Sequence, residues 1–252
     1  MRLIKKIARA FIRETACSNP QVSIDQPSRS LSANTLEIWD SVRPFTMTSL
    51  ERVAALCDSI DYIVRNGIAG QIVECGVWKG GSAMAAMLRL KQNGEISREF
   101  ALFDTFEGMT LPGEHDRDLK GVSAEQQLAA GPPESNLVWC RSHLDEVLHN
   151  ISLTGYDKGL ISCIKGNVLE TIPREGQEEI ALLRLDTDFY DSTLHELRHL
   201  YHHVAPGGVV IIDDYGHWRG CQKAVDEFFE AEPFRPLMHS IDYTGRIFVK
   251  PN

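Results

Sequence analysis

The sequence lacks several features that would place it in a class at once. None of its six cysteines forms a CxxC pair, so we expect a reduced cytoplasmic protein without a zinc site. No segment approaches the roughly 18 consecutive apolar residues of a membrane-spanning helix. Lys and Arg number 26 against 35 Asp and Glu, for a net charge of −9, so a nucleic-acid partner is not expected. A metal or a cationic ligand suits this balance better.

The first 14 residues, MRLIKKIARAFIRE, place apolar side chains on one helical face and basic side chains largely off it. Such a helix either packs on its own body or a partner subunit, or rests on an anionic membrane surface as a peripheral contact. The stretch has no signal-peptide apolar core. We expect residues 1–69 to be an N-terminal helical extension that serves oligomerisation or covers the substrate, in a homo-oligomer.

After residue 70, short apolar runs alternate with helical patterns, as expected of a single α/β domain over residues 70–252. Apolar runs without polar alternation, joined by helices, predict a parallel sheet covered on both faces. The predicted strands are 71–75, 100–103, 160–164, 180–185 and 209–212. The predicted helices are 49–66, 82–91, 143–152, 191–203 and 219–231.

The last and the least regular segments differ from this alternation. LMHSIDY (237–243) and RIFVK (246–250) flank Thr244-Gly245, which predicts an antiparallel hairpin at the end of the sheet. Residues 18–35 are polar and contain prolines, as in a loop. Residues 108–136 form a long polar insertion, and such insertions are commonly mobile lids. We therefore predict a lid that orders around bound ligands.

A glycine-rich turn follows the first predicted strand, in the sequence ECGVWKGGS. Gly76, Gly80 and Gly81 let the backbone approach a ligand at the start of a helix, but their spacing is not the G-x-G-x-x-G of dinucleotide-binding folds. Asp104 ends the second strand, the usual place for an acid that holds ribose hydroxyls. Each feature alone also occurs by chance in α/β folds. In this order on the first two strands, they favour a nucleoside ligand.

Two later strands end on carboxylates, in LRLDTDFYD and VVIIDDY. Asp186, Asp188, Asp213 and Asp214 would meet outside the carboxyl ends of neighbouring strands, where open α/β sheets bind ligands. Carboxylates that meet must protonate or recruit a cation, and oxygen ligands favour Mg²⁺ over zinc. The alternative is structural, because Asp188, Asp191 or Asp214 can also cap the helix that follows.

The motifs VECGVWKGGS, FDTFEGM, LLRLDTDFYDST and APGGVVIIDDYG, in this order, resemble the macrocin O-methyltransferase family of S-adenosylmethionine-dependent enzymes. The resemblance covers roughly residues 70 to 250 and implies a class I methyltransferase fold. That fold is a Rossmann-like, mostly parallel seven-stranded sheet with a C-terminal antiparallel pair. The sugar or glycoside that accepts the methyl group is not fixed by family membership.

The resemblance also implies where the cofactor S-adenosylmethionine lies. Glu74 and Gly76 would face its amino-acid end together with Ser82, and Asp104 would face its ribose. Asn167, in the turn after the third strand, falls where adenine contacts often lie in the family.

The same resemblance assigns roles to the four acids. Asp186, Asp213 and Asp214 match the family's metal ligands, and Asp188 matches its proposed base. A bound cation lowers the pKa of coordinated oxygen, so Mg²⁺ would activate a sugar hydroxyl while Asp188 accepts the proton. The resemblance leaves open whether Asp186 and Asp188 exchange these two roles.

Two other enzyme classes share part of this pattern. A metal-dependent glycosyltransferase uses D-x-D to hold a nucleotide diphosphate and stays the main alternative. An aspartate-nucleophile phosphatase also shows D-x-D and a later acidic strand end. However, only 27 positions separate Asp186 from Asp213, which leaves no room for the strands such an enzyme places between them. A non-catalytic scaffold would not need all four acids and the glycine turn.

Overall fold

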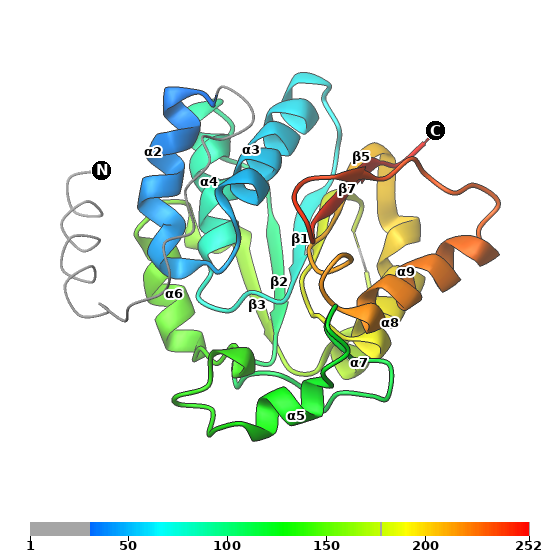
Figure 1. Ribbon diagram of the computed structural model, residues 1–252. Helices are drawn as coiled ribbons and strands as arrows, with labels where there is room; N and C mark the ends of the chain where they lie inside the picture. Colours follow the sequence, from blue (N-terminus) through cyan, green and yellow to red (C-terminus); the bar gives the residue numbers. More distant parts are fainter. Residues whose placement is uncertain (1–30, 177, 252) are drawn as a thin grey trace.

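The computed structural model describes residues 31–176 and 178–251. The helix predicted for the first 14 residues therefore lies outside the described residues. Within the described part, helices and strands alternate as predicted around one sheet (Figure 1).

The sheet has seven strands in the spatial order β3-β2-β1-β4-β5-β7-β6. The first five are parallel, and β7 pairs antiparallel with both β5 and β6. Their bounds are β1 (Gln71–Cys75), β2 (Phe100–Asp104), β3 (Ile161–Lys165), β4 (Ile180–Leu185), β5 (Val204–Ile212), β6 (His239–Ser240) and β7 (Arg246–Val249). This is the mostly parallel sheet with a C-terminal antiparallel pair that the sequence predicts.

The strand order reverses between β1 and β4, which are hydrogen-bonded neighbours. From β1 the chain proceeds outward to β2 and β3, and from β4 it proceeds in the opposite direction to β5. Ligands of open α/β sheets bind in the crevice outside the carboxyl ends at such a reversal. The topology therefore places the ligand site beside the ends of β1 and β4.

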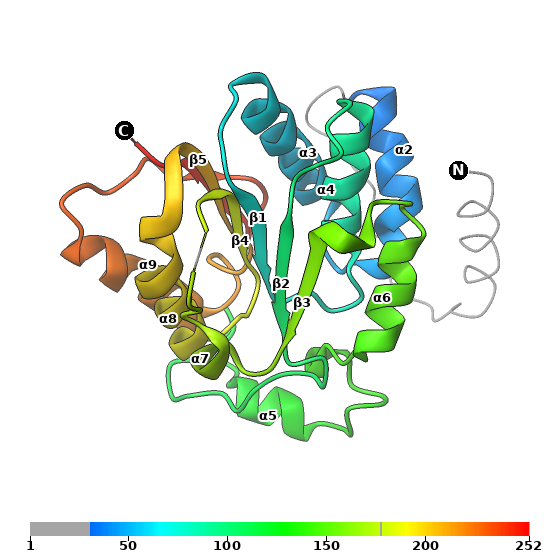
Figure 2. The ribbon, with the colours of Figure 1, turned by 180° about the vertical axis from the view of Figure 1, so that it is seen from behind.

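Helices cover both faces of the sheet (Figures 1 and 2). α2, α3, α4 and α6 contribute to the core on one face, and α8 and α9 to the core on the other. The α-helices are α2 (Ala33–Val42), α3 (Leu50–Arg65), α4 (Gly81–Gln92), α5 (Ala124–Ala129), α6 (Leu144–Ser152), α7 (Val168–Thr171), α8 (Tyr190–Leu200) and α9 (Arg219–Ala231). Short 3-10 helices are η1 (Arg43–Phe45), η2 (Leu137–Trp139), η3 (Lys158–Leu160) and η4 (Tyr201–His203).

Three boundaries differ from the sequence prediction. β5 begins at Val204 instead of residue 209, because Gly207 and Gly208 pair with Lys250 and extend the strand through APGG. The strand predicted over residues 237–243 is only two residues long. α2 begins inside the predicted 18–35 loop, where Ser32 caps the helix by accepting a hydrogen bond from the backbone N–H of Thr35 at 3.1 Å.

The predicted insertion lies at the carboxyl ends of the strands, with α5 within it (Figure 1). Its middle part is connected to the body of the domain. Asp118 forms an isolated bridge with Trp218, and the backbone N–H of Arg219 donates to the carbonyl of Arg117 at 2.8 Å. In the described part of the chain, no helix is both long and apolar enough to cross a membrane.

Candidate active site

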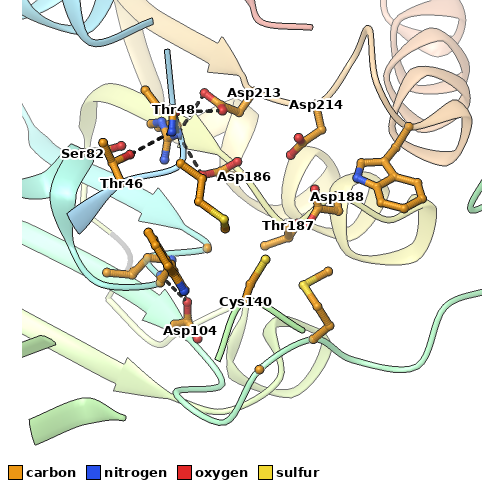
Figure 3. Close-up of a pocket in the computed structure, with 18 of the residues that line it drawn as sticks. Thr46, Thr48, Ser82, Asp104, Cys140, Asp186, Thr187, Asp188, Asp213 and Asp214 are labelled. Atoms are coloured by element: carbon orange, nitrogen blue, oxygen red, sulfur yellow. Dashed lines mark hydrogen bonds and ion pairs between the residues drawn. The ribbon is translucent and has the colours of Figure 1, made fainter. Parts of the chain in front are cut away.

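A cavity of about 410 Å³ opens at the carboxyl ends of the central strands. Residues from five strand ends line it: Gly76 and Val77 after β1, Asp104 of β2, Asn167 after β3, Asp186 and Asp188 after β4, and Asp213 and Asp214 after β5. Figure 3 shows Asp104 on one side of this cavity and the other four acids on the opposite side. The fold thus brings together the glycine turn and the acids predicted from the sequence.

The glycine turn contacts the start of the acidic loop directly. Gly76 has a φ of +84°, and a Cβ atom at this position would lie 2.0 Å from the backbone oxygen of Asp186. The backbone N–H of Asp186 donates to the carbonyl of Cys75 at 2.8 Å, and that of Gly76 donates to Phe103 at 2.9 Å. Only glycine fits between these backbones.

Asp104 organises the turn that surrounds it. Its Oδ2 accepts hydrogen bonds from the backbone N–H groups of Val77 at 2.7 Å and Trp78 at 3.0 Å, and its Oδ1 accepts one from Phe106 at 2.7 Å. The carboxylate also lines the cavity, as do Ser82 and Asn167. The side chain of Asn167 caps the first turn of α7 by accepting a hydrogen bond from Leu169.

Three of the predicted acids converge. Each of Asp186, Asp213 and Asp214 offers a carboxylate oxygen, and these oxygens lie within 4.8 Å of one another. Asp188 lies beside them at the cavity wall (Figure 3). It has a φ of +65°, an uncommon conformation for a residue other than glycine, and such strain clusters at functional sites.

Two arginines partly neutralise this cluster. Arg184 of β4 lies 2.8 Å from an oxygen of Asp186 and 2.9 Å from one of Asp213. Arg52 of α3 contacts the other oxygen of Asp213 and approaches Asp242 at 3.1 Å. The N-terminal extension therefore contributes a charged group to the acid cluster.

Glu74 lies outside the cavity wall. Its side chain is 4% exposed, and its carboxylate is 2.5 Å from a guanidinium nitrogen of Arg184. Glu74 is not among the residues that line the cavity. Its predicted contact with a cofactor stays a prediction, and in this structure it acts on the acids through Arg184.

Burial shifts the acids toward their protonated forms. The pKa of Asp188 is raised to about 7, mainly by burial and then by the nearby charge of Asp186, while hydrogen bonds with Asp214 and Trp218 oppose the shift. The pKa values of Asp186 and Asp214 are also well above the usual range, mainly because of burial and then because of neighbouring charges: Arg184 opposes the shift at Asp186, whereas the Asp188 carboxylate adds to it at Asp214. Carboxylates in this state gain from a bound cation.

The donor set fits a hard divalent cation. All three converging ligands offer oxygen, which Mg²⁺ prefers. Asp214 Oδ2 is buried and has no hydrogen-bond partner among the described residues, although an unpaired buried oxygen is costly. A cation beside Asp186, Asp213 and Asp214 would satisfy it.

The sequence analysis missed Thr48, Arg52 and Arg184. Thr48 Oγ1 donates to Asp213 at 3.2 Å and accepts from Arg184 at 3.1 Å. Arg184 had a visible signal, because an arginine inside the apolar strand IALLRL has to find buried partners. Thr48 and Arg52 had none, because they are more than 100 residues from the acids in the sequence.

A comparison with protein families identifies the family of this chain. The model of the macrocin O-methyltransferase family, TylF, matches residues 5–250. The chain belongs to this family.

Two curated relatives of this macrocin O-methyltransferase family member are O-methyltransferases by name, and the first name includes a rhamnosyl group. This chain is 32% identical over 207 residues to the 8-demethyl-8-(2,3-dimethoxy-alpha-L-rhamnosyl)-tetracenomycin-C 4'-O-methyltransferase of Streptomyces olivaceus. The match covers 82% of this chain and 76% of the relative. The chain is 30% identical over 202 residues to the mycinamicin III 3''-O-methyltransferase of Micromonospora griseorubida, covering 79% and 76%.

The solved structure of the O-methyltransferase NovP has the same fold. It superposes with a TM-score of 0.71 at 28% identity, over 82% of this chain and 83% of that one. The sheet order and the C-terminal antiparallel pair are those of a class I methyltransferase. This macrocin O-methyltransferase family member is thus an O-methyltransferase, as predicted, and the family favours methyl transfer over the glycosyltransferase and phosphatase alternatives.

Proposed function

We propose that the chain transfers the methyl group of S-adenosylmethionine to a hydroxyl group of a sugar or glycoside, assisted by Mg²⁺. The observation that carries the proposal is the one cavity that both the glycine turn and the acid cluster line. Both relatives named above are O-methyltransferases, and the name of the first gives a rhamnosyl natural product as its substrate.

S-adenosylmethionine, when bound, supplies the methyl group on a positively charged sulfur. Gly76, Ser82, Asp104 and Asn167 line the side of the cavity that suits this cofactor. The N–H groups of the turn are already held by Asp104, so this wall is organised before binding. Glu74 acts on the same region from behind, through its ion pair with Arg184.

Asp186, Asp213 and Asp214 would hold the cation, which lowers the pKa of a coordinated hydroxyl. Arg184 and Arg52 keep these carboxylates together in spite of their mutual repulsion. They do so without satisfying Asp214 Oδ2.

Asp188 is the proposed general base. It lies next to the three acids and is not part of their cluster. A base is most effective when its pKa is near the working pH, and the pKa of Asp188 is about 7. Asp188 has to be ionised to accept a proton, so methyl transfer should fall as the pH drops through the pKa of Asp188, which a cation bound at the neighbouring acids would hold below about 7.

Methyl transfer from S-adenosylmethionine to a panel of glycosides and phenols, with and without Mg²⁺, tests the proposal. Asp188→Asn should bind S-adenosylhomocysteine and Mg²⁺ normally but lose about 10²–10⁴ in rate, because an amide does not accept the proton. Asp213→Asn should instead bind Mg²⁺ more weakly and recover activity as Mg²⁺ is raised.

The two variants serve as controls for each other, since each replaces one carboxylate by an amide of the same shape. Rescue of Asp188→Asn by Mg²⁺ would reverse the roles of base and ligand. Full activity in EDTA would rule out the cation. Failure to bind S-adenosylhomocysteine would rule out the cofactor.

A further inference from the structure

One buried carboxylate, that of Asp116, adds to the contacts that attach the insertion to the domain. This side chain belongs to a residue that is only 2% exposed. Its Oδ2 accepts a hydrogen bond from the backbone N–H of Gly113 at 2.7 Å, within the insertion. Its Oδ1 accepts one from the backbone N–H of Tyr190 at 2.8 Å, in the first turn of α8. One carboxylate thus joins the insertion to α8.

The N-terminus of α8 has no capping side chain on its own N-cap residue. Its N-cap residue is Phe189, which has no side-chain oxygen, although helices of this kind usually begin with an acceptor side chain. Asp116, 74 residues away in the sequence, supplies that acceptor. Its negative charge also lies at the positive end of the helix dipole.

The same carboxylate lies against the first turn of α9. A Cβ atom at Gly220 would lie 1.9 Å from Asp116 Oδ1, so the carboxylate occupies the space of a missing side chain. The neighbouring residue Arg219 donates its backbone N–H to the carbonyl of Arg117. Asp116 is therefore placed where the first turns of α8 and α9 meet.

Both helices directly follow loops that carry the acids. Asp188 lies two residues before α8, and Asp214 lies five residues before α9. We propose that Asp116 is a positioning residue for methyl transfer: it fixes the first turns of α8 and α9 and thereby sets Asp188 against the acid cluster. This inference rests on the proposed function. It adds Asp116, a residue that does not line the active-site cavity.

The expected effect is on rate more than on binding. A displacement of about 1 Å in a reacting group costs up to about 10²-fold in rate. The residues expected to contact the cofactor, Gly76, Ser82 and Asp104, lie on other strands and turns. Loss of Asp116 should therefore lower kcat while leaving the affinity for S-adenosylhomocysteine nearly unchanged.

The test compares Asp116→Ala, Asp116→Asn and Gly220→Ala with the control Glu125→Ala. Glu125 is an exposed acid in α5 of the same insertion. We expect kcat to fall about 10²-fold in Asp116→Ala and less in Asp116→Asn, which keeps one acceptor oxygen. Gly220→Ala should also lower kcat, because its methyl group displaces the carboxylate. Glu125→Ala should match the wild type.

Amide hydrogen exchange gives a second readout that does not need an acceptor. Exchange in the first turns of both α8 and α9 should accelerate in Asp116→Asn and Gly220→Ala, and not in Glu125→Ala. Faster exchange in α8 alone would reduce Asp116 to a helix cap and overturn the inference.

An unchanged kcat in folded Asp116 variants would overturn it too, as would a loss of cofactor affinity equal to the loss of kcat. If the wild type transfers no methyl group, the proposed function is refuted instead. The exchange data still test whether Asp116 links α8 to α9.

Discussion

The two sides of the cavity use their polar groups in opposite ways. On the side of β1 and β2, the carboxylate of Asp104 accepts hydrogen bonds from three backbone N–H groups of the turns around it. On the side of β4 and β5, three carboxylates lie within 4.8 Å of one another, and one oxygen of Asp214 has no partner among the described residues.

The charge on the side of β1 and β2 is balanced by the protein itself, whereas the side of β4 and β5 still lacks positive charge. The first side needs no added ion, because its negative charge is balanced by N–H dipoles. The second side is held together by Arg52 and Arg184, yet pKa values in it remain raised. We therefore expect mutations on the side of β1 and β2 to change the affinity for the cofactor. Mutations on the side of β4 and β5 should change the free energy of unfolding.

The largest expected effect is at Arg184, which serves Glu74, Asp186 and Asp213 together. Arg184→Met should lower the free energy of unfolding by about 3–5 kcal/mol, because it leaves buried carboxylates without their shared cation. Urea denaturation measures the change. Arg52→Met is the matched control and should cost less, since Arg184 remains.

Mg²⁺ sharpens this comparison. If the acid cluster binds the ion, added Mg²⁺ should raise the melting temperature of Arg184→Met more than that of the wild type. An Arg184→Met protein as stable as the wild type would show that the acids at the ends of β4 and β5 do not depend on the guanidinium group of Arg184.

A smaller effect is expected at Asp104. Asp104→Ala should weaken binding of S-adenosylhomocysteine by roughly 10- to 100-fold, since hydrogen bonds to a charged group contribute about 1.5–3 kcal/mol. Calorimetry measures the affinity, and Asp104→Asn should lie between the variant and the wild type. Equal affinities in all three proteins would remove Asp104 from the cofactor side.

Per pH unit, the smallest effect should come from Glu196, a fully buried acid of α8. Burial raises its pKa from the ordinary 4.5 to about 8, while its hydrogen bonds with Thr187 oppose the shift. Between these pH values the folded state retains a proton that the unfolded state releases. The stability contributed by this proton is full below about pH 4.5 and is lost as the pH rises toward 8.

Glu196→Gln should remove that dependence. Relative to the variant, the wild type should lose up to about 1.4 kcal/mol of unfolding free energy for each pH unit across this window. Thr187→Val is a control that removes the hydroxyl and keeps the acid, so its pH dependence should persist. Parallel stability curves for the wild type and Glu196→Gln would contradict the raised pKa.

Local patterns in the sequence predicted most of the fold. The run IALLRL and the helical pattern at 219–231 coincide with β4 and α9, because burial on both faces and helical periodicity leave direct marks in a sequence. β5 was predicted too short because Pro206, Gly207 and Gly208 resemble a turn. Only pairing with the C-terminal strand, which is a long-range contact, keeps these residues extended.

The site was predictable to the same degree. The acids could be placed because they end strands whose carboxyl ends have to meet. Arg52 and Thr48 could not be placed, because α3 is brought to the acids by packing on α4 and not by any local motif. Asp116 looked like one acid in a polar insertion, and its burial becomes visible only in the folded chain.

The close contact at Gly76 has an evolutionary consequence. Its backbone separates the cofactor side from the acid loop by less than the space of one methyl group. No other amino acid can replace Gly76 unless the loop after β4 moves away from it. Gly94 also has a positive φ but nothing within 4 Å of its missing Cβ, so asparagine or aspartate can replace it at little cost. Descendants of this protein can therefore change Gly94 at little cost, but they inherit the junction at Gly76 intact.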